Sequence, residues 1–563
     1  MTLKNKGDIV EKNQAQRKGF VFFWQPQKKR RVFMFDLTRH RLFKMAASLL
    51  LSLALLCVYG VTPASAFVSE ARQYPVDNID GIISDVPTGG RWLQHLEEDL
   101  LPFWEMQTAW GSPVGNYPTY RCNDGSLYNM VEPCPELENP VPGIVKPERE
   151  YVRAKSRQIF AYGVAYNLTG ESKYLKLAKA GVDYLRTHAL APEGGAYTYF
   201  EDGVGLPSEA RRISQDMAYA VAGLGFYYYL TRDTDVLADI VALKDYIFDT
   251  YYDEEWGLLA WAHEDYVDYV NPDGTEEKVS TEQRELVAQL DQVYGYMLLL
   301  TPTLPETFNG KPLRSKWEDD LVHLATIMAE QFYTPDNNIF FGAITDPSKQ
   351  RLGTDHTDFG HSIKTLWLIY EIGKLTGHYE LTAFAQEKVP LIFEEAFLED
   401  GTWGRRINQY GQLETDKEWW ILAELDQTAA TFSLRDPSYA KYLPTTYAYW
   451  FEHMVDHEHG GIWHWVNARD NLPDIGFPKQ HSWKNAFHSF EHDLVGYITG
   501  QAIHNLPTTL YFAFKEIPEK TQIRPYLFAA KVHSLIEPCY DNGRKVQPIP
   551  GFQQQKVMFT DVR

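Results

Sequence analysis

Gly401-Thr402-Trp403-Gly404 is a short glycine and aromatic stretch between two segments with helical periodicity, Tyr379–Leu398 and Lys417–Ser433. Glycine permits a tight turn, and an aromatic side chain can pack against the flanking helices, so the stretch predicts a small hairpin. Similar stretches recur at Gly194–Tyr197, Trp256–Leu259, Asn338–Phe341 and Gly460–Trp463. A recurring helix, hairpin and helix unit indicates an internal repeat, whose units bury their apolar faces by stacking on their neighbours.

Amphipathic segments fill most of the chain between these hairpins, and their apolar spacing gives about twelve helices. They run over Arg91–Ala109, Glu148–Leu168, Ser172–His188, Ser208–Leu230, Thr234–Tyr251, Thr281–Leu300, Leu313–Tyr333, Thr354–Thr376, Tyr379–Leu398, Lys417–Ser433, Pro437–Asp456 and Trp483–Ala502. Six pairs that close on themselves predict an all-α (α/α)6 barrel, or toroid, with short β-hairpins between helix pairs. An open helical solenoid has the same periodicity and stays the alternative.

Composition divides the chain into four parts. We expect a basic leader with a signal peptide at 1–66, and an N-terminal helix and loop region at 67–147 whose first helix belongs to the barrel. The barrel itself is expected at 148–506 and a C-terminal extension at 507–563. In that extension, a few apolar turns precede a loop-like stretch, Gln547–Gln555.

The first 66 residues hold twelve Lys or Arg and three Asp or Glu, so their removal takes the formal charge from -21 to about -30. Basic residues precede the apolar run Ala46–Val61, and the small residues Pro63–Ala66 follow it. This order is typical of an export signal cleaved after Ala66, which predicts a periplasmic or extracellular protein. The alternative is a membrane anchor at 46–61, although that run is short for a bilayer.

The acidic mature chain would repel nucleic acid and anionic membranes, so we expect neither as a partner. Cys122 and Cys134 are close enough in sequence to form a disulfide in an oxidising compartment, which leaves Cys539 odd. The chain has no CxxC pair, and His453 and His457 are typical of a helix end. We therefore predict no metal site.

Charged and polar residues occur among apolar ones in the even-numbered segments, which would form the inner ring. They are Arg157, Asp216, Asp291, His361, Glu424 and His488. Buried charges cost several kcal/mol unless they are paired, so such a set is either an ion-pair network or a functional site. The two histidines favour a site, because imidazole transfers protons near neutral pH.

His488 lies within Lys479–Asp493, which reads K-Q-H-S-W-K-N-A-F-H-S-F-E-H-D. We expect a helix to begin at Trp483, with Ser482 capping its first turn. Aromatic rings beside an imidazole suit a sugar-like substrate, because they cover the apolar face of a sugar while the imidazole moves a proton. The residues Asp355–Asp358 are read as the polar start of the helix that carries His361.

Four motifs, in order along Glu148–Leu506, resemble those of the N-acylglucosamine 2-epimerase family. They are Arg157-Gln158-Ile159-Phe160 for R-x-x-W, Gly360-His361 for G-H-x-x-E, Trp419–Glu424 for W-W-x-x-A-E and Trp483–His488 for W-K-x-x-Y-H. This family includes cellobiose 2-epimerases and aldose–ketose isomerases on an (α/α)6 barrel. The resemblance implies that His488 and His361 are the acid/base pair, that Arg157 contacts the sugar oxygens, and that Trp420, Trp483 and Glu424 line the pocket.

The chain also departs from the family pattern at three positions. Lys364 stands where G-H-x-x-E has glutamate, Asp291 where many members have histidine, and Met217, beside Asp216, where some isomerases have histidine. A lysine here would depress the pKa of a facing imidazole. Our hypothesis is that Lys364 pairs with Asp291 or Glu424 as a charge-swapped substitute.

With the leader, the resemblance implies an exported carbohydrate epimerase or isomerase that acts at C2 of an aldose, or between C1 and C2, by histidine-mediated proton transfer. Neither route needs a metal or redox cofactor. The substrate would be a monosaccharide or oligosaccharide, and the oligomeric state stays open. One alternative is a glycoside hydrolase or lyase on the same toroid, with Asp216, Asp291 or Glu424 as paired carboxylates. Another is a sugar-binding relative without catalytic activity.

Overall fold

The computed structural model describes residues 78–563 apart from 139–143, 145, 147, 208–210, 272, 539, 542 and 543. The expected leader at 1–66 and Cys539 lie outside the described residues. Cys122 and Cys134 form a disulfide, as the sequence suggested. Within the described ranges, no helix combines the length and the apolar character needed to cross a membrane.

Six helical elements are buried along nearly their whole length. They are α6 (Val152–Thr169), α8 (Ser214–Thr231), α10 (Leu286–Gln292) continued through the π-helical turn Val293–Met297 into α11 (Leu298–Leu300), α13 (Phe359–Thr376), α15 (Trp419–Ser433) and α17 (Phe487–Ile503). A helix that is buried on every side belongs to the interior of a fold. We call these six the inner helices.

A second set of helices alternates with the inner ones and buries only one face. It comprises α3 (Gly89–His95) with α4 (Leu101–Trp104), α7 (Ser172–Tyr184), α9 (Thr234–Tyr251), α12 (Arg314–Ile327), α14 (Tyr379–Ala396) and α16 (Leu443–Tyr449). The short helices α2 (Ile79–Asp85) and α5 (Pro135–Glu138) lie near the N-terminal end of the described chain. Two helix sets with this difference in burial agree with the assignment of the even-numbered segments to the inside.

Each inner helix packs against the next one along the chain: α6 on α8, α8 on α10, α11 on α13, α13 on α15 and α15 on α17. Helix α17 also packs on α6, so the last inner helix lies beside the first. Short antiparallel pairs connect the helices at the positions of the predicted hairpins. The prediction of a mainly helical fold with small hairpins is confirmed.

All the strand pairs outside the C-terminal region are short and antiparallel. They are β1 (Glu150–Tyr151) with β2 (Tyr199–Glu201) and β3 (Val204–Leu206), β4 (Tyr252–Asp253) with β5 (Leu258–Leu259), β6 (Tyr266–Val270) with β7 (Glu276–Val279), β8 (Thr307–Phe308) with β9 (Lys311–Pro312), β10 (Tyr333–Thr334) with β11 (Ile339–Phe340), β12 (Arg406–Ile407) with β13 (Leu413–Glu414) and β14 (Lys417–Glu418) with β15 (Trp465–Val466).

The inner helices begin two to six residues later than the apolar periodicity suggests. Before most of these helices, except α17, the preceding residues are extended because they pair with the chain that follows the next hairpin. Ile213 pairs with Ala262, just before α8, and Glu285 pairs with Ala343, just before α10. Periodicity alone cannot reveal such long-range pairing, so the predicted helices wrongly included these residues.

The start of α17 at Phe487 corrects the expected start at Trp483. The hydroxyl of Ser482 does not cap the helix but donates to the carbonyl of Ile144, 3.0 Å away. The Asn485 side chain accepts from the backbone N–H of Phe487 at 3.0 Å instead. Lys484 is buried and donates to the Ile462 carbonyl at 2.8 Å, which holds these residues outside the helix.

The C-terminal region forms a three-stranded antiparallel sheet in the order β16 (Thr508–Phe514), β20 (Gln553–Thr560) and β17 (Lys531–Ile536), with a separate hairpin of β18 (Tyr540–Asp541) and β19 (Arg544–Lys545). The expected loop at Gln547–Gln555 is thus partly wrong, because its last three residues begin β20. Three polar glutamines begin this strand, so its start carries no apolar signal, although later residues such as Val557 and Phe559 are buried. Strand β16 packs on α6 and α8.

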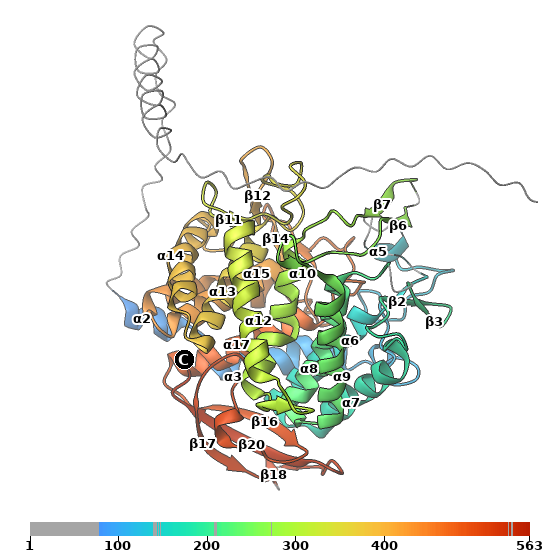
Figure 1. Ribbon diagram of the computed structural model, residues 1–563. Coiled ribbons are helices and arrows are strands. Elements are labelled where there is room, and N and C mark those ends of the chain that lie inside the picture. The colour runs from blue at the N-terminus through green and yellow to red at the C-terminus, as the bar shows by residue number, and fades with distance from the viewer. Residues whose placement is uncertain are drawn as a thin grey trace, which may run out of the picture. The chain divides into compact units, whose positions relative to one another are not determined.

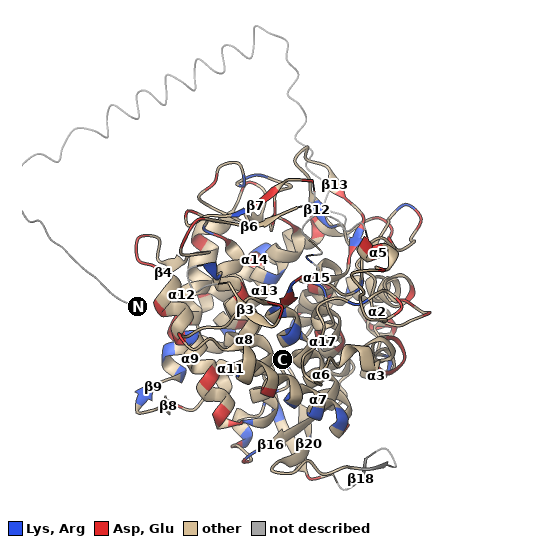
Figure 2. Ribbon diagram, turned by 90° about the vertical axis from the view of Figure 1, so that its right-hand side faces the viewer, with Lys and Arg blue, Asp and Glu red and all other residues tan. Residues whose placement is uncertain are grey.

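The sheet and most of the inter-helix hairpins lie at opposite ends of the inner helices. Figure 1 shows β16, β17 and β20 at one end and β6, β7, β12 and β14 at the other. The perpendicular view in Figure 2 has the same arrangement, with the hairpin of β8 and β9 at the sheet end, and shows acidic and basic residues interspersed on this side. The net negative charge of the chain therefore does not form a single acidic face in this view.

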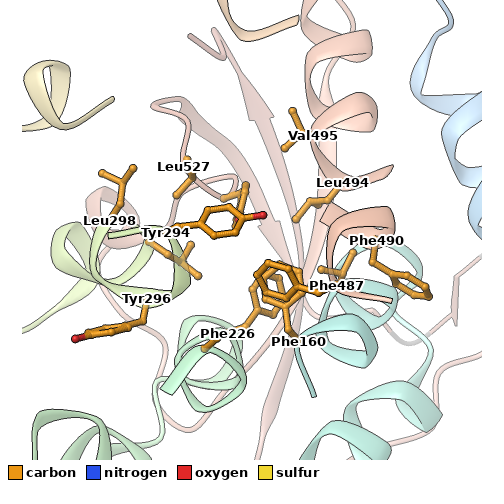
Figure 3. Close-up of a cluster of buried hydrophobic side chains, with 14 of the residues drawn as sticks. Phe160, Phe226, Tyr294, Tyr296, Leu298, Phe487, Phe490, Leu494, Val495 and Leu527 are labelled. Carbon is orange, nitrogen blue, oxygen red and sulfur yellow. The ribbon is translucent and has the colours of Figure 1, made fainter. Parts of the chain in front are cut away.

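Aromatic side chains from different inner helices fill the space between the two ends, as Figure 3 shows. The ring of Phe160 lies 4.4 Å from that of Phe226 and 4.3 Å from that of Phe487, and Tyr294 lies 5.5 Å from Phe487. Rings at these separations pack favourably and fill a core with few cavities. This core closes the space between the inner helices beneath their N-terminal ends.

Candidate active site

A cavity of about 380 Å³ lies at the N-terminal ends of the inner helices. Seven of the nine predicted site residues line it: Arg157, Asp291, His361, Lys364, Trp420, Trp483 and His488. Six of these lie within the first six residues of an inner helix, and Trp483 precedes α17. The structure thus brings residues that are more than 300 positions apart in sequence to one pocket of a size typical for small ligands.

His361 is held by the residue that caps its own helix. Asp358 precedes α13, and its side chain accepts from the backbone N–H of His361 at 2.8 Å and contacts the ring nitrogen Nδ1 at 2.7 Å. Burial lowers the pKa of His361 below its usual value, although Asp358 opposes this shift. Burial would raise the pKa of Asp358, but the His361 imidazole and N–H lower it to about 2. The carboxylate therefore stays charged, orients the ring and can balance its charge when the imidazole is protonated.

His488 is held from behind, through its Nδ1 atom. The hydroxyl oxygen of Tyr294 and Oε1 of Glu424 each lie 3.2 Å from this nitrogen. None of the hydrogen bonds of the described residues engages the other ring nitrogen, Nε2. Burial, together with the nearby cations Lys364 and Arg157, lowers the pKa of His488 well below its usual value. A neutral ring with one unengaged nitrogen is the form that can accept a proton.

Trp420 connects the two histidines. Its ring lies 4.6 Å from that of His361 and 6.0 Å from that of His488, centroid to centroid, and its Nε1 donates to Glu418 at 2.8 Å. Trp483 stacks on Trp419 with a centroid distance of 5.7 Å. These indole rings give the cavity an apolar wall between groups that can transfer protons, which suits the apolar face of a sugar ring.

Lys364 and Asp291 form an ion pair inside the cavity, with 3.9 Å between Nζ and Oδ1. Asp291 also accepts from the Gln215 side chain at 2.7 Å, and the Lys364 ammonium lies 4.4 Å from the centroid of the Tyr294 ring. Burial would lower the pKa of Lys364, but its neighbours, Asp291 among them, raise it above its usual value. The geometry supports the charge-swap hypothesis with Asp291 as the partner.

Arg157 offers a second cation to the same space. It donates from a terminal nitrogen to the Trp483 carbonyl at 2.6 Å, and its guanidinium lies 3.7 Å from the centroid of the Tyr219 ring. Its Nε is buried and has no hydrogen-bond partner among the described residues. No carboxylate of the described chain lies within ion-pair distance of Arg157. The guanidinium charge is therefore free to act on a negatively charged group in the cavity.

Asp216 and Glu424 do not line this cavity. Asp216 forms an ion pair with Arg153, whose Nε lies 2.6 Å from Oδ1, and it lines an adjacent cavity of about 350 Å³. Glu424 is completely buried behind His488, and burial raises its pKa well above the usual value. The sequence predicted that Glu424 lines the pocket, whereas in the structure it lies behind His488 and contacts Nδ1 of its imidazole.

Three residues that the sequence reading did not select lie behind His488. The hydroxyl of Tyr294 bonds Glu491, and the hydroxyl of Tyr526 donates to the same carboxylate at 2.5 Å. All three are buried. Glu491 lies one helical turn after His488, a spacing that carries some signal. Tyr526 comes from the C-terminal region, and nothing local in the sequence links it to the histidine.

Two groups of described residues bring three side chains of metal-binding type within 4.8 Å of one another. In the first, Cys122 and Cys134 are already joined in the disulfide. In the second, Glu424, His488 and Glu491, tyrosine hydroxyls bond both oxygens of Glu491. A cation would have to displace these bonds and approach the charged Lys364, so we assign neither group as a metal site.

The chain is similar in sequence and in fold to known sugar epimerases and isomerases. No protein-family model matches the chain. The cellobiose 2-epimerase of Eubacterium cellulosolvens is 25% identical over 412 residues, which cover 70% of this chain and 95% of the relative. Among solved structures, cellobiose 2-epimerase from Spirochaeta thermophila has a TM-score of 0.60 at 17% identity and covers 76% of this chain and 100% of its own.

A crystal structure of a D-mannose isomerase also matches, with a TM-score of 0.57 at 17% identity, over 76% of this chain and 99% of its own. At these identities the solved structures establish a common fold. The four motifs, the shared fold and the sequence similarity all indicate the same group of proteins. Over about 70% of its length the chain is a distant homologue of the cellobiose 2-epimerases of the N-acylglucosamine 2-epimerase family.

Proposed function

We propose that the protein is a sugar 2-epimerase or aldose–ketose isomerase that moves a proton at C2 of an aldose. One observation carries the proposal: His361 and His488, far apart in sequence, line the same cavity with the Trp420 ring between them. The relatives, named as cellobiose 2-epimerases and a D-mannose isomerase, support a sugar as the substrate.

The proton on the carbon beside a sugar carbonyl is only weakly acidic, so its removal needs a positioned base and a stabilised product anion. His488 would accept this proton on Nε2, because its Nδ1 is held by Tyr294 and Glu424. The resulting enediolate would lie near the cationic Arg157 and Lys364. The N-terminal ends of the inner helices add positive potential in the same place.

His361 would complete the reaction from the other wall of the cavity. As an imidazolium paired with the Asp358 carboxylate, it would give its Nε2 proton to the opposite face of C2, and the sugar is epimerised. The proton taken up by His488 would then pass to solvent, and His361 would regain a proton from solvent. If a proton is delivered to C1 instead of C2, an aldose becomes a ketose. Either outcome uses the same two imidazoles and the same enediolate, so both activities fit the pocket.

The three carboxylates that the sequence suggested for glycoside hydrolysis do not support that reaction. Hydrolysis needs two carboxyl groups that flank the scissile bond. Asp216 is bound to Arg153 outside the cavity, Asp291 is held by Gln215 and Lys364, and Glu424 is buried. None of these three carboxylates has both an open face toward the cavity and a free partner across it.

Incubation with a panel of aldoses in deuterated water tests the function. We expect deuterium at C2 of recovered sugar, together with the C2 epimer or the ketose, measured by NMR and mass spectrometry. Cellobiose and mannose belong in the panel because of the relatives. Cleaved products would indicate a hydrolase or lyase, and binding without label or product would indicate a sugar-binding protein.

We propose further that the six helix pairs close into an (α/α)6 toroid. The packing of α17 on α6 supports closure, because an open solenoid would leave its first and last inner helices apart. In a closed ring, the first and last helices would be expected to cross-link when cysteines are placed on their facing surfaces.

Export after cleavage at Ala66 remains our proposal for the leader. The Cys122–Cys134 disulfide supports it, because such bonds persist in oxidising compartments. We expect the mature protein to begin at Phe67 and to be recovered in the periplasm or medium, as measured by mass spectrometry of its N-terminal peptide. Recovery of the uncut chain in the membrane fraction would favour the anchor.

A further inference from the structure

The C-terminal segment between β16 and β17 reaches the inner helices from the end opposite the cavity. Its residue Tyr526 is buried, with a backbone φ of 55°. The backbone N–H of Tyr526 donates to the Tyr229 hydroxyl of α8 at 2.8 Å, and that hydroxyl donates to the Arg524 carbonyl at 2.7 Å. The neighbouring Leu527 joins the aromatic core drawn in Figure 3. These contacts fix where the Tyr526 hydroxyl points.

The Tyr526 hydroxyl points at Glu491 of α17, which is completely buried. It donates to Oε1 of Glu491 at 2.5 Å, while the Tyr294 hydroxyl donates to Oε2. The Tyr294 oxygen in turn lies 3.2 Å from Nδ1 of His488. A continuous series of hydrogen-bonding groups therefore runs from the C-terminal segment to the cavity: Tyr526, Glu491, Tyr294 and His488.

We propose that Glu491 and Tyr526 are positioning residues that set the tautomer and orientation of His488 through Tyr294. The inference rests on the proposed function of His488 as the base. An ionised Glu491 accepts from both tyrosines, so the Tyr294 oxygen is left to accept from His488. The ring then carries its proton on Nδ1, and the lone pair on Nε2 faces the cavity. A protonated Glu491 can donate to Tyr294, which then donates to Nδ1 and puts the imidazole proton on Nε2.

Titratable or charged groups on several elements face Glu491. They are Glu424 on α15, Lys364 on α13, Tyr294 between α10 and α11, Tyr526 in the C-terminal segment and His488 on the same helix. Burial raises the pKa of Glu491 to about 7, although the two tyrosine hydroxyls and Lys364 oppose the rise. Burial also raises the pKa of Glu424 well above its usual value.

The pH dependence of turnover follows from the ionisation of Glu491. Above pH 7 Glu491 is ionised and His488 has the tautomer of a base, and as the pH falls through about 7 this tautomer is lost. The pKa of His488 lies well below its usual value, so its own protonation falls in a separate, more acidic range. A fall in kcat near pH 7 would therefore report on Glu491.

Two variants and one control test the proposal in the full chain. Glu491→Gln should lower kcat about 10- to 100-fold, as loss of a residue that orients a metal-bound imidazole does elsewhere, and should remove the step near pH 7. Tyr526→Phe should keep the step but move it to higher pH, because the carboxylate loses one donor. KM should change little in either variant.

Tyr166→Phe is the matched control. It removes another buried tyrosine hydroxyl at the interface with the C-terminal region, which donates to the Phe512 carbonyl at 3.1 Å. If the variants act only by loosening this interface, all three should change the pH profile alike. If Glu491 and Tyr526 position His488, the pH profile of Tyr166→Phe should stay unchanged.

Nitrogen-15 NMR of ring-labelled histidine provides a readout that needs no substrate, with the His488 signals assigned by their loss in His488→Asn. We expect the Nδ1–H tautomer above pH 7 in the unaltered protein and a loss of this preference in Glu491→Gln. An unchanged tautomer in the folded Glu491→Gln protein would overturn the inference, whether or not a sugar is turned over. Failure of every aldose to exchange would instead count against the proposed function.

Discussion

Replacement of His488 with asparagine is expected to lower the rate of deuterium incorporation at C2 by about 10²- to 10⁴-fold, the usual contribution of a positioned general base. The physical reason is that His488 is the imidazole whose Nε2 faces the cavity while Nδ1 is held by Tyr294 and Glu424. Asparagine keeps a polar side chain of similar reach but cannot accept a proton at neutral pH. Exchange measured by NMR under saturating sugar gives the rate directly.

His492→Asn is the control for this variant. His492 lies on the same helix, one turn further on, and it is also completely buried. It packs on Trp450 at a centroid distance of 4.4 Å and pairs with Asp426 at 3.3 Å, and it does not line the cavity. We expect His492→Asn to lose stability but to keep its exchange rate per folded molecule. Undiminished exchange in His488→Asn would instead remove His488 as the base.

The two histidines could be selected from the sequence because each lies in a local motif at the start of an inner helix. The capping residue Asp358 was read only as part of a polar helix start, although it orients His361. A side chain that both caps a helix and contacts a residue on its first turn leaves a local signal, so this role was within reach of sequence reasoning.

The support behind His488 could not be predicted in the same way. Tyr294, Glu491 and Tyr526 come from three separate segments, and the hydrogen bonds between them depend on how those segments pack. The late starts of the inner helices had the same origin, because Ile213 and Glu285 pair with residues tens of positions away. Local propensity gave the number and order of the helices, whereas the contacts between distant segments decided the site.

Replacement of Lys364 with methionine is expected to have two large effects that can be separated. The variant should lose about 3–5 kcal/mol in the free energy of unfolding, because Asp291 is left as a buried carboxylate without its cation. It should also lose about 10²- to 10³-fold in kcat, which is typical when one stabilising group for a developing oxyanion is removed. Urea unfolding and deuterium exchange measure the two quantities.

A second substitution distinguishes the structural role of the ion pair from its role in the reaction. In Lys364→Met combined with Asp291→Asn, no unpaired charge is left, and the asparagine can still bond Gln215. Stability should therefore return to within about 1–2 kcal/mol of the unaltered protein, since replacing both partners of a buried pair is often nearly neutral. The exchange rate should stay low, because the cation near the enediolate is still missing.

Lys179→Met is the control, since Lys179 lies on the surface, pairs with the exposed Asp183 at 2.6 Å and does not line the cavity. It should leave the exchange rate unchanged. It should lower the free energy of unfolding by no more than the usual contribution of a surface ion pair, about 0–1 kcal/mol. If the double variant regained both stability and turnover, Lys364 would serve only to neutralise Asp291. Arg157 would then be the cation that stabilises the enediolate, and the departure from the family pattern at 364 and 291 would be one exchanged structural pair.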